Sequence, residues 1–194
     1  LYALADALGI AAAWALGGVV LMVAGAIAMV ITVAVKWICV GTQTAGDHPL
    51  WSAFVWLNEL QDTFVEAVAA PWFFTHAYGM GEINQGLRAL GVTIGRGAWI
   101  DSYWFPETDL CFVGEGASVG PGTVVQTHLF QDRVMSLDTV TIKAGATLGS
   151  HSVALPASVI GSVATVGPGS LVMRGDQVPS NSEWQGNPIE PWKH

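Results

Sequence analysis

One histidine lies in an irregular segment where it could do chemistry. His128 belongs to QTHLFQDRVM, and Asp132 and Arg133 come after it in the same segment. An imidazole titrates near neutral pH, so His128 is a candidate general base. Asp132 could orient its ring, and Arg133 could bind a phosphate or another acidic group. His151 is the competing base, because it has the same place in its own repeat that His128 has. Since its hexad is regular, it is also a candidate substrate-binding, surface or inter-protomer residue.

Two carboxylates lie in a second irregular segment, WFPETDL. Glu107 and Asp109 could bind the ammonium group of an amino-acid substrate, since opposite charges pair well in a site shielded from water. They could equally cap the turn in which they lie. The sequence leaves both roles open, and we treat the pair as candidate substrate-binding residues.

The elements that must position these residues are indicated by a repeat of six. Aliphatic residues recur at every sixth position in most of the segment between residues 94 and 178, and the fifth residue of most hexads is small. A helix of 3.6 residues per turn cannot keep this period, whereas a triangular coil of three hexads can. The pattern predicts a mainly β fold, a left-handed parallel β-helix over residues 90–194. About 84/18, or 4.7, coils are enough for a continuous core.

The repeat is interrupted twice, and the interruptions contain the candidate residues. The step from Ile100 to Val113 is 13 residues, where a regular repeat would give 12. The step from Val125 to Ile142 is 17 residues, where a regular repeat would give 18. Because only regular hexads stack, each irregular segment is predicted to leave the coil as a loop. Loops on a rigid scaffold are where functional sites concentrate.

The histidines do not have the spacing of a metal site. Zinc chemistry of the γ-carbonic-anhydrase kind would need three converging histidines. Only His128 and His151 lie in the regular repeat, because His48 and His76 precede it. The two cysteines are far apart and are expected to be reduced thiols. We therefore expect no bound metal.

The chain begins with a membrane segment. Between Asp6 and Lys36 there is no charged residue, and the stretch exceeds the roughly 20 apolar residues that cross a bilayer. Residues 1–41 are predicted to contain a transmembrane helix. Lys36 and Trp37 suit an interface anchor and favour a cytoplasmic location, at the cell membrane, for the residues after them. The first residue is Leu1 rather than Met, so we expect the chain to be part of a longer product.

Residues 42–89 are predicted to form a membrane-interface helical segment. Glu59, Asp62 and Glu66 share one helical face, and apolar side chains occupy the remainder. We expect an amphipathic helix with its apolar side in lipid or against a partner, although a buried helix of the C-terminal domain is an alternative. The net charge of −8 argues against nucleic acid as a partner.

These motifs resemble known families. The run from residue 142 to residue 188, with TLGSHSVALP, SVIGSVATVGPGSLVM and a closing GNP, resembles the hexapeptide-repeat acyltransferases, which are trimeric coenzyme A-dependent enzymes. That resemblance implies that a histidine at the start of an extruded loop deprotonates the acceptor, a place held here by His128. A wider resemblance covers HPLW, LRALGVTIGRGAWIDSYW and QTHLFQDRVM. These are similar to the tandem C-terminal domains of membrane-bound nonribosomal-peptide-synthetase-like enzymes that make ε-poly-lysine.

The wider resemblance implies amide-bond formation at the membrane. In that family, adenylation and carrier domains load an amino acid as a phosphopantetheine thioester, and the C-terminal domains couple it to a free amine. It implies carrier and adenylation domains, a lipid bilayer and a trimer or pseudo-trimer as partners. The alternatives are a coenzyme A-dependent O- or N-acetyltransferase and a non-catalytic scaffold. The sequence does not decide the donor.

Overall fold

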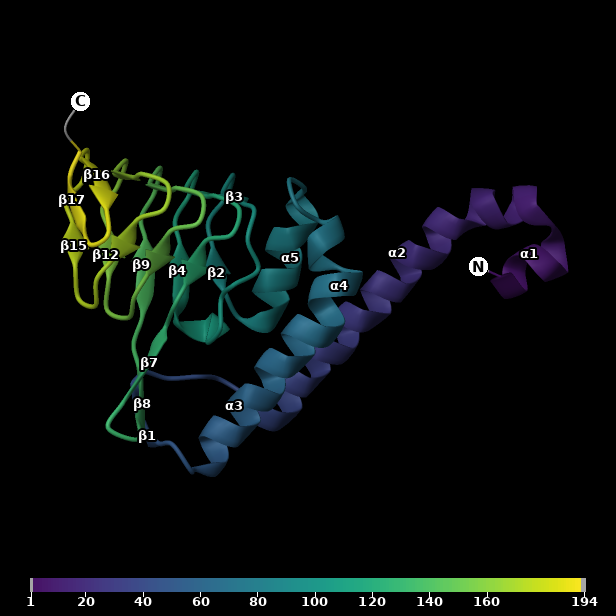
Figure 1. Cartoon of the computed structure of the whole chain (residues 1–194), viewed down its shortest axis with the longest axis horizontal. Coiled ribbons are helices and arrows are strands. Elements are labelled where there is room, and N and C mark those ends of the chain that lie inside the picture. Colours follow the sequence, from purple (N-terminus) through teal and green to yellow (C-terminus); the bar gives the residue numbers. More distant parts are fainter. Residues whose placement is uncertain (1, 193–194) are drawn as a thin grey trace.

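The chain forms a column of parallel β-coils with long helices beside it (Figure 1). The computed structural model describes residues 2–192. The helices precede the coils, apart from the short η4, and they have these bounds: α1 Tyr2–Leu8, α2 Ile10–Val35, η1 Lys36–Val40, α3 Ala53–Phe64, η2 Val65–Ala69, α4 Ala70–Trp72, η3 Phe74–His76, α5 Gly81–Leu90 and η4 Thr108–Leu110.

A long apolar helix is present where the sequence predicts a membrane span. Among residues 2–192, one helical stretch, Ile10–Val40, is long and apolar enough to cross a membrane. It consists of α2 and η1. The side chains of α2 are exposed over much of its length, and α1 folds back against its N-terminal part after Gly9, whose φ of 87° suits a glycine.

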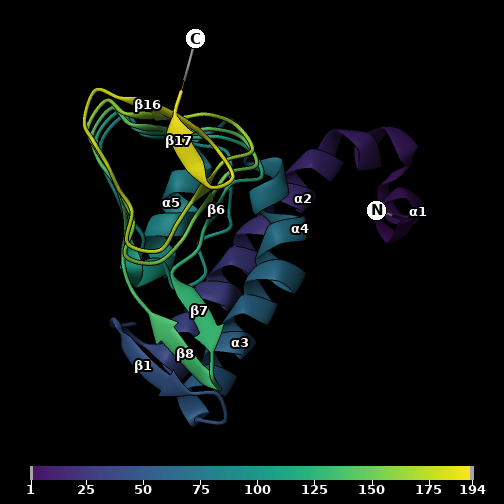
Figure 2. The ribbon, with the colours of Figure 1, turned by 60° about the vertical axis from the view of Figure 1, so that its left-hand side comes forward.

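A second long helix runs antiparallel to the C-terminal half of α2 (Figures 1 and 2). It comprises α3, η2 and α4 in succession. The two helices approach closely at Gly25, where a Cβ atom would collide with the backbone carbonyl of Trp72. Glycine is therefore required at this crossing, because any side chain would push the helices apart.

The face that α3 turns toward the protein is partly polar. Val55, Asn58 and Gln61 are buried, whereas Trp56 and Leu60 are 61% and 40% exposed. The sequence correctly predicts helix here and indicates that its apolar side chains need a partner. It does not predict that two buried amides form the inner face.

The β-coils form a three-sided column (Figure 2). Strands two to four residues long stack in parallel into three sheets, with orders β16-β13-β10-β5-β3, β14-β11-β6 and β15-β12-β9-β4-β2. The predicted parallel β-helix is thereby confirmed. Its strands are β2 Thr93–Ile94, β3 Trp99–Ile100, β4 Cys111–Val113, β5 Ser118–Val119, β6 Val124–Val125, β9 Val140–Ile142, β10 Thr147–Leu148, β11 Val153–Ala154, β12 Val159–Ile160, β13 Thr165–Val166, β14 Leu171–Val172, β15 Gln177–Val178 and β16 Glu183–Gly186.

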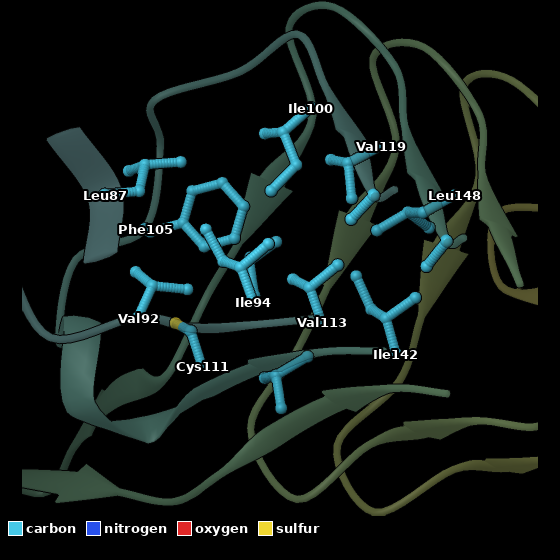
Figure 3. Close-up of a cluster of buried hydrophobic side chains, with 14 of the residues drawn as sticks. Leu87, Val92, Ile94, Ile100, Phe105, Cys111, Val113, Val119, Ile142 and Leu148 are labelled. Atoms are coloured by element: carbon cyan, nitrogen blue, oxygen red, sulfur yellow. The ribbon is translucent and has the colours of Figure 1, made fainter. Parts of the chain in front are cut away.

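The inward residues of the hexads make the core of the column (Figure 3). Ile94, Val113 and Ile142 stack in register on one sheet, and Val119 and Leu148 stack on the next. All of these side chains are at least nine-tenths buried. Burial of such side chains contributes about 1.5–3 kcal/mol each, which explains why the hexad period tolerates little variation.

Both ends of the column are covered. Leu87 of α5 and Phe105 close the N-terminal end (Figure 3), and both side chains are buried. At the other end β17, Ile189–Pro191, pairs antiparallel with β16 and crosses the opening (Figure 2). The helical segment thus supplies one of the two caps that the stacked coils need to bury their last apolar layer.

The second irregular segment is a hairpin rather than a loop. β7, His128–Gln131, and β8, Val134–Leu137, pair antiparallel, and β8 also pairs with β1, Gly46–Pro49. This three-stranded sheet projects from the column beside α3 (Figure 2). Met135 and Leu137 are buried against Val55 of α3, so apolar packing fixes the hairpin on the helical segment.

Candidate active site

His128 lies where the chain leaves the β-coil. It is the first residue of β7, and its ring Nδ1 lies 2.8 Å from Oε1 and 3.0 Å from Oε2 of Glu107. Glu107 comes from the first irregular segment, just before η4. The two interruptions of the hexad period therefore meet at one point and bring an imidazole against a carboxylate.

The carboxylate of Glu107 is fully buried and accepts hydrogen bonds from two side-chain donors. Asn58 Nδ2 donates to Oε1 at 2.7 Å, and Thr127 Oγ1 donates to Oε2 at 2.5 Å. A charge held away from water needs donors of this kind, because burial without them costs several kcal/mol. Asn58 and Thr127 supply two such donors, so the geometry presents Glu107 as a hydrogen-bond acceptor.

This arrangement selects one tautomer of His128. A carboxylate that only accepts requires a hydrogen on Nδ1, so in the neutral imidazole Nε2 keeps its lone pair. The side chain is 14% exposed, and in the described part of the chain its ring hydrogen bonds involve Nδ1 alone. Phe130 contacts the ring edge to face, with centroids 5.1 Å apart. Nε2 is thus able to take a proton from a substrate.

The site is held from behind by the helical segment. Gln43 Nε2 donates to Asn58 Oδ1 at 2.6 Å, and Gln61 Nε2 donates to the carbonyl of Pro106 at 3.1 Å. Gln43, Asn58 and Gln61 are buried. Sequence patterns alone did not identify these amides as part of a site. The available signal was polar residues at positions 58 and 61 of an otherwise apolar helix face.

The two carboxylates predicted to bind substrate have other partners. Glu107 is occupied by His128, Asn58 and Thr127, so it serves the histidine rather than an ammonium group. Asp109 Oδ2 forms an ion pair with Lys36 at 2.7 Å and accepts from the backbone of Gln43 at 2.9 Å. It joins the end of the membrane helix to the β-coil.

The sequence predicts Asp132 as the partner of the His128 ring, but the ring contacts Glu107 instead. Asp132 and Arg133 form the exposed tip of the β7–β8 hairpin, with positive φ angles of 50° and 65°, at the opposite end from His128. His151 lies on an exposed corner of the coil, where its ring covers Gly122. The structure brings neither Asp132 nor Arg133 to the imidazole, so Asp132 does not orient the ring here, and the predicted phosphate contact of Arg133 stays untested.

A small cavity lies next to the Glu107 segment. It measures about 40 Å³ and is lined by Asp62, Glu66, Tyr103 and Pro106, with Trp104 and two apolar residues. Burial, together with the charges of Glu107, Glu59 and Glu66, raises the pKa of Asp62 to about 8. A larger cavity of about 440 Å³ is lined almost wholly by apolar side chains of α1 and α2.

Neither metal ligation nor a thiol nucleophile is evident in residues 2–192. That part of the chain holds no group of three or more histidine, cysteine, aspartate or glutamate side chains arranged to bind a metal ion. Both cysteines are free. Burial and, to a lesser extent, the charge of Glu107 raise the pKa of the Cys111 thiol well above its ordinary value, so this thiol stays protonated in the core.

Comparisons with known proteins relate the chain to a synthetase. It is 34% identical over 164 residues to delta-poly-L-ornithine synthetase of Acinetobacter baumannii, a match that covers 84% of this chain and 12% of that protein. The chain therefore spans about an eighth of the length of this relative. No family model matches the sequence.

Solved structures with partial resemblance include a hexapeptide-repeat acetyltransferase of Vibrio cholerae in complex with acetyl coenzyme A. It has 19% identity and a TM-score of 0.46, over 53% of this chain and 60% of that one. Serine acetyltransferase of Brucella abortus has 16% identity and the same TM-score of 0.46, over 71% of this chain and 50% of that one.

Proposed function

We propose that this chain is an acyltransferase that forms amide bonds from an aminoacyl thioester and a free amine, with His128 as the general base. The observation that carries the proposal is the contact between His128 and the buried carboxylate of Glu107. The similarity to a poly-ornithine synthetase supports an amine acceptor of the amino-acid type.

The proposed reaction uses each ring nitrogen for one task. Nδ1 donates to Glu107, which holds the ring and stabilises the imidazolium that forms. Nε2 takes a proton from the attacking amine as its nitrogen bonds to the thioester carbonyl carbon. The tetrahedral adduct then expels the thiolate, which receives the proton from Nε2 as the carbon–sulfur bond breaks. Amide and free thiol are the products, and the histidine returns to its starting state.

We propose a phosphopantetheine thioester on a carrier domain as the donor, with coenzyme A as the alternative. The carrier and adenylation domains would belong to the same longer protein, as in the ε-poly-lysine synthetases that the sequence resembles. Arg133, at the exposed hairpin tip, stays a candidate contact for the phosphate of either arm. Asp132 and His151 keep only peripheral roles in this proposal.

The exterior of the β-coil offers an apolar face for a neighbouring coil, as the proposed trimer or pseudo-trimer requires. Trp104, Val124, Val153 and Leu171 lie in register on the outer side of one sheet, and all four are apolar and at least partly exposed. This ladder adjoins the corner from which β7 leaves. We propose that it packs on a neighbouring left-handed coil, from a second chain or from a tandem repeat, and that the neighbour completes the donor site.

A membrane location fits the exposed apolar surface of the helices. Trp14, Met22 and Val30 of α2 are 82%, 76% and 68% exposed, and Trp56 of α3 is 61% exposed. In a bilayer these side chains would face lipid, and the helix would anchor the β-coil on the cytoplasmic side. The proposal therefore includes lipid as an obligatory partner.

The test is acyl transfer by the chain reconstituted in lipid nanodiscs. Ornithyl and lysyl thioesters of a carrier protein, the same thioesters of coenzyme A, and acetyl coenzyme A are each supplied with free ornithine or lysine. Mass spectrometry detects the amide and the released thiol. Aminoacyl amide from a carrier thioester supports the proposal, and product from acetyl coenzyme A alone supports the acetyltransferase alternative. No product above the H128A level with any donor contradicts acyl transfer.

A further inference from the structure

Two buried amides form a chain of hydrogen bonds that ends on Glu107 and His128, the proposed catalytic pair. Gln43 is 2% exposed and Asn58 is fully buried. Gln43 donates to Asn58 at 2.6 Å, and Asn58 donates to Glu107 Oε1 at 2.7 Å, the same oxygen that lies 2.8 Å from His128 Nδ1. Three separate segments thus converge: the linker before β1, helix α3 and the segment before η4.

The direction of this chain is dictated by the carboxylate. Glu107 accepts, so Asn58 must turn its Nδ2 toward it and its Oδ1 toward Gln43. Gln43 must then present Nε2, which also donates to Gln61 Oε1 at 3.3 Å. If the Gln43 amide were reversed, its oxygen would face two other acceptors, Oδ1 of Asn58 and Oε1 of Gln61. Oε1 of Gln43 has no hydrogen-bond partner among the described residues, so only the donor side of this amide is held.

We propose that Asn58, oriented by Gln43, is a positioning residue for His128, an inference that rests on the proposed function. Glu107 rotates about three side-chain bonds, and two donors from outside the ring hold it: Asn58 on Oε1 and Thr127 on Oε2. With both in place the carboxylate faces Nδ1, and the ring keeps the tautomer with a free Nε2. Without Asn58, Oε1 of Glu107 loses this donor, the carboxylate is free to rotate, and the tautomer of His128 is no longer fixed.

The first test measures the tautomer directly and needs no acyl transfer. Histidines labelled with ¹⁵N are observed by NMR in nanodiscs at a pH where the ring is neutral, and His128 is assigned from the signal that H128A loses. The wild type is expected to show a protonated Nδ1 and an unprotonated Nε2. N58L, which keeps the side-chain size, is expected to show a mixture.

The matched control is N84L. Asn84, on α5, donates to the carbonyl of Ala98 at 2.8 Å and does not touch the catalytic pair. N84L removes one amide donor of the same kind and is expected to leave the His128 spectrum unchanged. An N58L spectrum identical to that of the wild type would overturn the positioning role, as would an equal change in N84L.

The second test uses the pH profile of acyl transfer in N58D. An aspartate at this place would lie hydrogen-bonded to Glu107, and two such carboxylates share one proton. While it holds that proton it donates as Asn58 does, so activity at low pH should stay within about threefold of the wild type. As the proton leaves with rising pH, activity should fall by about tenfold or more relative to the wild type.

The charged groups near position 58 are Glu107 and His128 from the β-coil and Glu59 and Asp62 on α3 itself, with Lys36 and Asp109 beyond Gln43. Asp62 titrates in the same range, so the profile is repeated in a D62N background. If the pH profile of N58D ran parallel to that of the protein with Asn58 in the same background, the positioning role would be overturned. If the wild type transfers no acyl group but N58L still mixes the tautomers, the proposed function fails and the positioning role stands.

Discussion

Lys36, which follows the long apolar helix α2, forms an ion pair with Asp109, two residues beyond Glu107. The Nζ–Oδ2 distance is 2.7 Å, and the lysine side chain is fully buried. The positive group after the apolar run, which suggested an interface anchor in the sequence, is therefore a link between the helix and the β-coil. It places the end of this apolar helix within a few residues of the candidate site.

Breaking this pair on one side should destabilise the protein strongly. K36M leaves Asp109 without its cation, which costs about 3–5 kcal/mol for a buried pair. The double variant K36M/D109N removes both charges and keeps an acceptor for the backbone of Gln43, so it should recover most of that loss. Thermal unfolding in nanodiscs measures both. Equal losses in the single and the double variant would show that the charge pairing is not what matters.

The crossing of α2 and α4 should tolerate no side chain at position 25. In G25A the new Cβ meets the backbone carbonyl of Trp72, and the resulting strain should cost about 1–3 kcal/mol. Gly18, seven residues earlier on the same helix, has nothing within 4 Å of its Cβ position. G18A should be neutral or slightly stabilising. Similar unfolding temperatures for the two variants would contradict the observed crossing.

The titration of Asp62 should make the protein less stable as pH rises. Its pKa is raised from 3.8 to about 8, so between these values the folded chain holds a proton that the unfolded chain has lost. The stabilisation is complete below about pH 4 and disappears through pH 8, with a slope of at most about 1.4 kcal/mol per pH unit.

D62N removes this contribution and serves as the reference. Unfolding free energies of the wild type and of D62N are compared from pH 5 to pH 8.5. The unfolding free energy of the wild type should fall steadily relative to that of D62N as pH increases. A difference that does not change with pH would mean that Asp62 is already ionised in the folded protein.

The fold was predictable because its core obeys a strict period. Each aliphatic residue of a hexad must point inward, so Val119 and Leu148 could be assigned to the core without knowledge of their neighbours. The helix α2 could be assigned from its long uncharged apolar run, and the helix α3 from the spacing of the acidic residues on one face. The hairpin was missed because its pairing with β1 depends on a segment that precedes it by about 80 residues.

The site was predictable in its members but not in their roles. His128 and Glu107 were both candidates, since both lie where the period breaks. Sequence spacing favoured Asp132 as the partner of the ring, because it is near in the chain. The hairpin carries Asp132 away, and the β-coil brings Glu107 to within 2.8 Å. Asn58 comes from a different element altogether, and only packing of α3 on the coil reveals it.

The rate of a single turnover in H128A tests the central claim most directly. The substrates are the preloaded carrier thioester and a saturating amine, in the same nanodiscs used for the wild type, with unfolding temperatures measured in parallel. H151A is the matched control, because His151 is an exposed histidine of the same coil. We predict that H128A folds normally and loses about 10²–10⁴-fold in rate, while H151A loses much less. Equal losses in the two variants, or a loss in H128A that unfolding explains, would contradict the assignment of His128 as the base.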